Sequence, residues 1–162
     1  MAIEQKITPY LWFDSNADEA VAFYLSVFKD SRIVTRSRYG DAGPRPKGST
    51  LAIAFRLEGQ NFVAINGGPH FKLNEAVSFY VNCETQEEID RLWDKLLAGG
   101  GQVHDCGWLK DRYGLSWQIN YAGVQDMMTD AHPERADKVM QAMMKMKKID
   151  IQKLKDAYEA GR

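Results

Sequence analysis

The chain has 162 residues, which is enough for one domain of about 150 residues or for two smaller modules that share a core. Hydrophobic residues make up 44% of the sequence and charged residues 27%, a composition that excludes an intrinsically disordered protein. The 21 Lys and Arg residues nearly balance the 22 Asp and Glu residues, and the formal charge of −1 gives no electrostatic reason to bind nucleic acid.

The sequence also predicts a protein that does not bind a membrane. No apolar run approaches the ~20 residues of a membrane span, and residues 1–6 lack the apolar core of a signal peptide. The two cysteines, Cys83 and Cys106, are too few for a disulfide framework. We therefore expect a cytoplasmic location.

The first half of the chain predicts a strand, a helix and three further strands. The aromatic and β-branched run 7–13 is typical of a strand, and a helix is expected over 17–28. Asn16 stands three residues before Glu19, the spacing of an N-cap and its N3 partner. Three strands are expected at 32–39, 49–57 and 61–66, with a hairpin at 59–60 and a loop at 40–48 whose role as a lid is left open.

The second half repeats this order about 69 residues later. Residues 76–82 match the first strand, and Thr85 stands three residues before Glu88 as a second N-cap pair. A helix over 86–98 and strands at 102–104, 107–110 and 115–121 complete the repeat. We therefore expect a single domain, residues 1–162, built from β-α-β-β-β modules at about 3–67 and 75–122.

A helical tail is expected from about 124 to 160. Residues 137–146 show helical spacing, and the apolar stripe continues to Tyr158. The tail is rich in methionine, which favours packing on the domain or on a partner subunit. Acidic residues stand beside its lysines, so we interpret the lysines as a solvated helix face rather than a nucleic-acid surface; they are Lys145, Lys147, Lys148, Lys153 and Lys155.

Alternation along the strands places polar and aromatic side chains on common faces. In the last strand Ser116, Gln118 and Asn120 share one side, while Trp117 and Ile119 point to the other, toward the helices. Three similar rows are expected in other strands: Thr8, Tyr10 and Trp12; Phe62, Ala64 and Asn66; Ser78, Tyr80 and Asn82. If the sheets curl into a cup, these rows suit a small organic ligand. The alternative is a solvated sheet face whose polar groups are satisfied by water.

Other kinds of site have weaker support in the sequence. The histidines His70, His104 and His132 lack a short metal-ligand spacing and are interpreted as surface or loop residues. Cys106 near His104 is a candidate reactive thiol, although an inert buried cysteine is favoured. The glycines at 99–101 follow a helix and are expected to terminate it rather than bind phosphate. No dinucleotide, S-adenosylmethionine or acyl-transfer serine fingerprint is present.

Several stretches resemble PhnB-like proteins, which are labelled 3-demethylubiquinone-9 3-methyltransferase-like and belong to the vicinal oxygen chelate superfamily of glyoxalase I, bleomycin-resistance proteins and extradiol dioxygenases. The stretches are 7–14, 20–24, 31–33 and 106–118, the last reading CGWLKDRYGLSWQ. The resemblance covers nearly the whole chain, including tail residues 142–146. It implies an α+β fold in which paired βαβββ modules form cup-shaped sheets, with a C-terminal helical tail, and it implies a homodimer.

The resemblance also bears on metal binding. Enzymes of the superfamily hold a divalent metal through cup-facing residues, typically His and Glu, on the first, fourth, fifth and eighth strands. The matching positions here are Thr8, Asn66, Ala76 or Ser78, and Gln118. Because hydroxyl and amide oxygens alone hold a transition metal poorly, we expect no metal and no other cofactor.

These observations lead to one main hypothesis and two alternatives. We expect a metal-free homodimer that binds a small-molecule ligand through six residues: Tyr10, Trp12, Asn66, Ser78, Tyr80 and Gln118. One alternative is an enzyme acting on a small aromatic or quinone-like metabolite, with Cys106, Asp111 or Tyr80 as catalytic candidates. The other is the methyltransferase activity that the family label implies.

Overall fold

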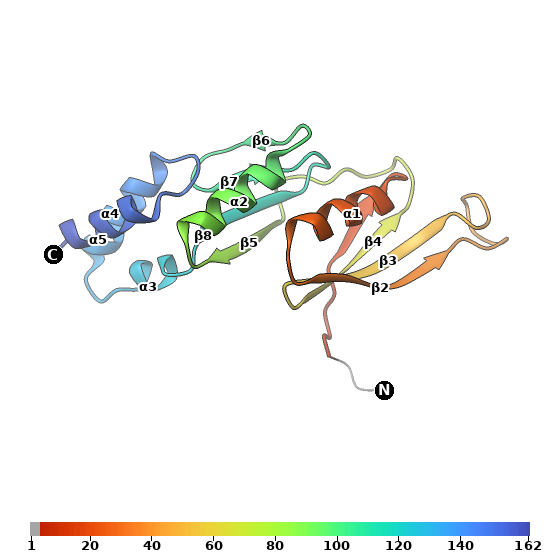
Figure 1. Ribbon diagram of the computed structural model, residues 1–162, viewed down its shortest axis with the longest axis horizontal. Coiled ribbons are helices and arrows are strands. Elements are labelled where there is room, and N and C mark those ends of the chain that lie inside the picture. Colours follow the sequence, from red (N-terminus) through yellow and green to blue (C-terminus); the bar gives the residue numbers. More distant parts are fainter. Residues whose placement is uncertain (1–3) are drawn as a thin grey trace. The chain divides into compact units, whose positions relative to one another are not determined.

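The computed structural model describes residues 4–162, which divide into two compact units, the first ending at Leu73 and the second running from Asn74 to Arg162 (Figure 1). Residues 1–3 lie outside the described residues; they include the expected start of the first module and part of the segment interpreted as lacking a signal peptide. Each unit contains the expected helix and four-stranded sheet.

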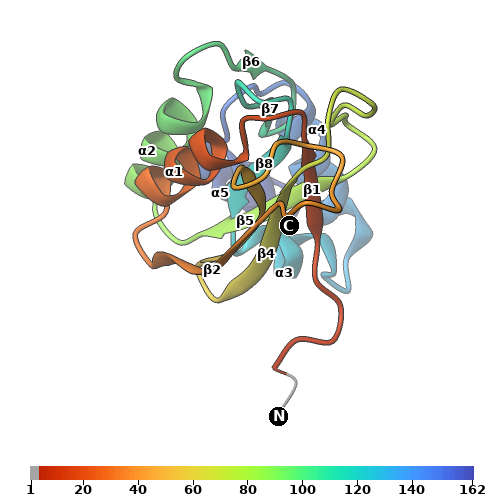
Figure 2. The same cartoon turned by 90° about the vertical axis from the view of Figure 1, so that its right-hand side faces the viewer.

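The elements of the first unit are β1 (Tyr10–Phe13), α1 (Ala17–Val27), β2 (Ser31–Arg38), β3 (Thr50–Leu57) and β4 (Gln60–Asn66). The sheet order is β1-β4-β3-β2, in which β1 pairs parallel with β4 and the other pairs are antiparallel. The expected hairpin is present between β3 and β4, and its turn is made by Glu58 and Gly59. The segment before β1 runs on beyond the sheet (Figure 2).

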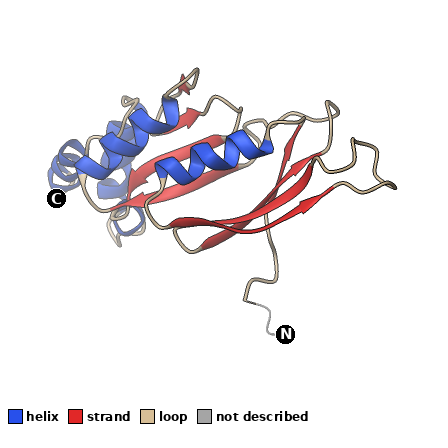
Figure 3. Ribbon diagram, turned by 45° about the vertical axis from the view of Figure 1, so that its right-hand side comes forward, coloured by secondary structure: helices blue, strands red, loops and turns tan. Residues whose placement is uncertain are grey.

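The core of the first unit lies between α1 and one face of this sheet (Figure 3). Tyr24 of α1 is fully buried and stacks on Phe55 of β3, with ring centroids 6.4 Å apart. Phe55 in turn stacks on Phe62 of β4 at 5.5 Å. Leu11 and Phe13 of β1 are buried as well, so this face is the apolar one.

The second unit repeats the topology with β5 (Ser78–Cys83), α2 (Gln86–Leu97), β6 (Gln102–Val103), β7 (Trp108–Lys110) and β8 (Ser116–Tyr121). The sheet order is β5-β8-β7-β6, and β5 pairs parallel with β8. Ile89, Leu92 and Leu96 of α2 are buried, and so are Leu109 and Ile119 of the sheet. The internal repeat predicted from the sequence is confirmed.

The two helix starts differ: both predicted residues occupy N-cap positions, but only one of them caps its helix with its side chain. The Thr85 hydroxyl accepts a hydrogen bond from the Glu88 N–H (3.2 Å), as expected. The Asn16 side chain makes no capping bond to α1. Instead, the Ala17 N–H at the start of α1 donates to the Asn66 side chain (2.9 Å). A cap supplied from β4 leaves no local signal in the sequence.

The tail forms three helices, α3 (Val124–Met128), α4 (Pro133–Met144) and α5 (Ile151–Ala160). Helices α4 and α5 lie side by side (Figure 1). The helical spacing predicted over 137–146 ends at Met144, and residues 145–150 form a connecting strap. Val139, Ile149 and Leu154 are fully buried, so the tail packs on the second unit as expected. No helix within residues 4–162 combines the length and apolar character needed to cross a membrane.

Candidate functional site

Each sheet has one face packed by its helix, α1 or α2. The opposite face of the second sheet is partly covered, because Ser116 and Asn120 are buried there and Asn120 donates to the sulfur of Met143 on α4 (3.6 Å). In the first unit, pairing places Tyr10 beside Val63 and Trp12 beside Ile65, on the side opposite to α1. Tyr10 is 64% exposed. The predicted placement of Tyr10 and Trp12 on one face is therefore confirmed.

Trp12 is held in place by the segment that follows β4. Its indole N–H donates to the carbonyl of Gly68 (2.9 Å). Phe71 meets the Trp12 ring edge to face, with centroids 4.9 Å apart, and remains 66% exposed. Phe71 was not predicted as a site residue, because the sequence places it in a loop with no alternating pattern. Together Tyr10, Trp12 and Phe71 form what we call the aromatic shelf.

Asn66 lies on the other face of the first sheet, which corrects the sequence prediction. It is paired with Phe13 and is buried on the α1 side. Its side-chain oxygen accepts from the Ala17 N–H, and its amide donates to the Thr50 carbonyl (3.2 Å). Phe62 shares this buried row. The amide of Asn66 therefore links α1 to β3, and it does not face Tyr10 and Trp12.

The face of the second sheet opposite α2 carries the polar row that the sequence predicts. Tyr80 pairs with Gln118 and Ser78 with Ser116, whereas Trp117 is buried on the helix side. The Gln118 side-chain amide donates to the Ser78 hydroxyl (3.0 Å). We call Ser78, Tyr80 and Gln118 the polar row, in which Tyr80 is the register partner of Gln118.

The polar row is neutral at physiological pH. Burial raises the pKa of Tyr80, with a smaller contribution from Cys83, so its phenol keeps its proton. Tyr80 is still 43% exposed and can donate a hydrogen bond outward. Beside the row, the Ser116 hydroxyl is buried without a hydrogen-bond partner among the described residues. Phenol, hydroxyl and amide groups together suit a neutral, oxygen-bearing ligand.

Asp111, a catalytic candidate from the sequence, has a structural role. It is 2% exposed. One oxygen accepts from the backbone N–H groups of Tyr113 (2.8 Å) and Leu115 (3.1 Å). The other accepts from the indole N–H of Trp117 (2.9 Å). Asp111 therefore fixes the turn that precedes β8 and offers no free oxygen for proton transfer.

The two cysteines differ in their surroundings. Both are free thiols. Cys83 is buried, and burial raises its pKa to about 12, which leaves the unreactive thiol form. Cys106 is half-buried rather than fully buried, and it sits in a tight turn at a positive φ of 60°.

The residues at the family's metal-ligand positions do not fit a transition metal. The side-chain oxygen of Asn66 accepts a hydrogen bond from the first residue of α1, and the Gln118 amide donates a hydrogen bond to the Ser78 hydroxyl. None of the three carries a charge or an imidazole. Within residues 4–162 no group of three or more His, Cys, Asp or Glu side chains is arranged to hold a metal ion.

Comparison with known proteins establishes the family. The family model described as 3-demethylubiquinone-9 3-methyltransferase matches residues 5–120. The chain belongs to this family. A Bacillus cereus PhnB protein, described as a 3-demethylubiquinone-9 3-methyltransferase, is 42% identical in sequence. The match covers 73% of this chain and 100% of the Bacillus protein, with a TM-score of 0.66.

More distant solved structures share the fold alone. A Pseudomonas aeruginosa protein is 24% identical (73% of this chain, 98% of that one, TM-score 0.60). The fosfomycin resistance protein FosX of Listeria monocytogenes, solved with Mn(II) and sulfate, is 12% identical (78% and 97%, TM-score 0.54). Family and fold together place the chain in the vicinal oxygen chelate superfamily, with the expected α+β fold. No curated protein sequence matches the chain.

The comparisons correct one expectation about the tail. The family match ends at residue 120, and the Bacillus protein is fully covered by 73% of this chain. The resemblance expected at residues 142–146 is therefore not part of the family match. Helices α3, α4 and α5 form a C-terminal extension beyond it.

Proposed function

We propose that this protein binds a small organic molecule, without a metal, through side chains of its two sheets. The aromatic shelf belongs to the first unit and the polar row to the second. The contacting residues in this proposal are Tyr10, Trp12, Phe71, Ser78, Tyr80 and Gln118. Asn66 is left out because its side chain faces α1.

The observation that carries the proposal is the geometry of the polar row. The Gln118 amide donates to Ser78, which leaves the Gln118 oxygen as an acceptor and the Ser78 hydroxyl proton as a donor. Tyr80, on the neighbouring strand, adds a protonated phenol. Such a set of neutral donors and acceptors orients carbonyl or hydroxyl groups of a ligand.

The aromatic shelf suggests the ligand's shape. The indole N–H of Trp12 is already bonded to Gly68, so the ring offers apolar surface rather than a polar contact. Exposed aromatic rings favour flat, unsaturated ligands. The names of the family and of the Bacillus protein also refer to a demethylubiquinone. Oxygenated aromatic rings and quinones are therefore the ligand class that we propose, whether the protein binds or converts them.

Thermal-shift measurements on the purified full chain test this function. The probes are catechol, 4-hydroxybenzoate and a short-chain ubiquinone analogue. A ligand present at ~100 times its dissociation constant stabilises the protein by about 2.7 kcal/mol. We expect Gln118→Leu and Trp12→Ala each to reduce the ligand-induced rise in melting temperature strongly, because each substitution removes one of the proposed contacts.

The matched control is Gln125→Leu, which alters an exposed glutamine on α3 outside both surfaces. It should keep the wild-type shift. A full shift in both Gln118→Leu and Trp12→Ala would contradict the proposed surfaces, and so would the absence of a shift with every probe.

We further propose that the chain forms a homodimer in the cytoplasm. Helix α4 exposes Met144 (66%) and Met140 (37%), which lie four residues apart on one helix face. Exposed methionines at helical spacing are typical of adaptable contact surfaces. Two free cysteines and no disulfide among the described residues accord with a reducing compartment.

A further inference from the structure

The strap at residues 145–150, between α4 and α5, is fixed to the second unit by its backbone. The Cys106 N–H donates to the Met146 carbonyl (2.9 Å) and the Gly107 N–H to the Lys147 carbonyl (2.8 Å). On its other side, Gln86 of α2 bonds twice: its amide donates to the Ile149 carbonyl (2.9 Å) and its oxygen accepts from the Ile151 N–H (2.8 Å).

Side chains of the strap strengthen this attachment. Ile149 is fully buried, and it lies so close to Gly107 that a β-carbon there would stand 2.9 Å from its side chain. Gly107 also has a φ of 81°, so the strap depends on a glycine at this position. Lys148 pairs with Asp90 of α2 (2.9 Å), and Lys147 pairs with Asp105. The strap is therefore a rigid support rather than a flexible linker.

A hollow of about 750 Å³ lies between the strap and the first turns of α2 and α5. Five lysines line it, against three carboxylates, Glu84, Asp90 and Asp150. We call it the lysine groove; its lysines are Lys145, Lys147, Lys148, Lys153 and Lys155. All five lysines are exposed, as the sequence predicts, and they lie around one space on the strap and α5 rather than along a single helix face.

The lysines outnumber the lining carboxylates, although Lys147 and Lys148 are already paired with Asp105 and Asp90. Asp90 pairs with Lys148, and Asp150 caps α5 by accepting from the Lys153 N–H (3.1 Å). In the described part of the chain, Lys145 and Lys153 make no ion pair. Thr85 and Asp150 cap α2 and α5 with their side chains, so the lysines, not the helix N-termini, supply the positive charge of the groove.

We propose that the lysine groove binds a small molecule that carries more than one phosphate group. Lysine ammonium groups act as point charges suited to phosphate oxygens. The lining residues that the structure describes include no arginine to grip a carboxylate in two bonds and no aromatic ring to stack a nucleobase. The volume lies within the range of small-ligand sites. The residues that line the groove include none of the aromatic shelf or the polar row, so this proposal can fail without the proposed function failing.

Isothermal titration of the full chain with inorganic tripolyphosphate tests the proposal. We expect saturable binding by the wild type that weakens at raised ionic strength. The double variant Lys145→Gln/Lys153→Gln should bind at least about tenfold more weakly, because two charge-assisted contacts are lost. The control variant Lys29→Gln/Lys72→Gln removes two exposed lysines of the first unit and should bind like the wild type.

A second measurement needs no variant. Tripolyphosphate should protect Lys145 and Lys153 of the wild type from acetylation by a reactive ester, as read by mass spectrometry, while Lys29 and Lys72 stay reactive. Absence of saturable binding, equal binding by both double variants, or equally tight binding of the tricarboxylate citrate would overturn the proposal. Lack of protection at Lys145 and Lys153 would overturn it as well.

Discussion

At the end of β4 the side chain of Asn66 joins α1 to β3, and its backbone carbonyl accepts from the buried hydroxyl of Tyr39 (2.6 Å). One amide thus satisfies groups from elements that are far apart in sequence. In the second unit Asp111 has a comparable role. Its carboxylate accepts three hydrogen bonds, from Tyr113, Leu115 and Trp117. Both side chains are polar because buried N–H and carbonyl groups require partners.

Asp111→Asn provides a test of the structural role of Asp111. The substituted amide cannot accept both from the backbone N–H groups and from Trp117, because one oxygen becomes an NH₂ donor. We expect the free energy of unfolding, measured by urea denaturation, to fall by about 1–3 kcal/mol. Asp41→Asn, on an exposed loop residue, is the control and should change stability little. An unchanged stability of Asp111→Asn would contradict this role.

The residue-scale predictions from the sequence succeeded where alternation and composition agree. In β8 the polar residues Ser116 and Gln118 alternate with large apolar ones, and the structure confirms their faces. In β4 both rows contain apolar residues, such as Phe62 and Val63, so alternation alone does not identify the row that meets the helix. The polar Asn66 therefore suggested the wrong face.

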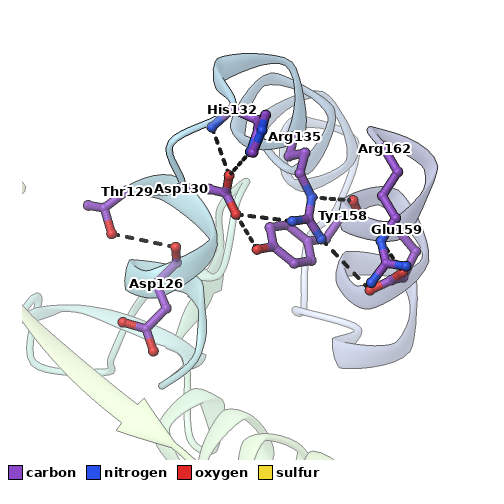
Figure 4. A network of polar contacts seen from close by, with 8 residues as sticks. All are labelled: Asp126, Thr129, Asp130, His132, Arg135, Tyr158, Glu159 and Arg162. Atoms are coloured by element: carbon purple, nitrogen blue, oxygen red, sulfur yellow. Dashed lines mark hydrogen bonds and ion pairs between the residues drawn. The ribbon is translucent and has the colours of Figure 1, made fainter.

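At the scale of elements, a polar network joins α4 and α5 of the C-terminal extension (Figure 4). Asp130, between α3 and α4, accepts hydrogen bonds from the phenol of Tyr158 on α5 and from the backbone of His132 (2.8 Å). Arg135 donates to Asp130 (3.2 Å), and its guanidinium lies 3.5 Å from the centre of the Tyr158 ring. The network ties α5 to the start of α4.

This network predicts a loss of stability in acid. The hydrogen bond from Tyr158, followed by that from the His132 backbone, lowers the pKa of Asp130 from 3.8 to about 2. Because the folded state favours the ionised carboxylate, the stabilisation is complete above the unfolded pKa and is lost as the pH falls from about 3.8 to about 2. Urea midpoints measured across this range should fall for the wild type.

The variant Asp130→Asn isolates this contribution. It should be less stable than the wild type at neutral pH, and the difference between the two proteins should shrink as the pH approaches 2. Asp126→Asn, on the exposed side of α3, serves as the matched control and should follow the wild type. If the difference between Asp130→Asn and the wild type stays constant with pH, the network is not the source of the acid sensitivity.

At the scale of the whole molecule, the chain consists of the family's two modules plus an extension. The family match ends at residue 120, yet Met143 of α4 receives a hydrogen bond from Asn120 of β8 (Nδ2 to sulfur, 3.6 Å). The extension therefore packs on the last strand of the family fold. Its outer surface carries Met140 and Met144, which the dimer proposal uses.

Sedimentation velocity tests the homodimer. We expect the wild type to have a molecular mass in solution of about twice the 18.4 kDa of one chain. The double variant Met140→Gln/Met144→Gln should shift the population toward monomer, because it removes apolar surface from α4. Val103→Gln alters another exposed apolar residue, on β6, and should leave the dimer intact. A monomeric wild type would contradict the proposal.

The repeat and the helical tail could be predicted because strand composition, helix spacing and order recur along the chain. The lysine groove could not be predicted, since it depends on Gln86 and Gly107 fixing a strap more than 35 residues later in the sequence. Phe71 was missed for a similar reason: its contact with Trp12 comes from a loop without periodicity.

The parallel pairing of β1 with β4, and of β5 with β8, has a consequence for synthesis on the ribosome. The earliest strand of each sheet has no neighbour until the latest one emerges, so Tyr10–Phe13 must wait for Gln60–Asn66. Every strand of the first sheet is then complete before Ser78 is translated. A nascent chain can therefore finish one sheet before the ribosome makes its counterpart, which shortens the time during which two similar modules could exchange strands.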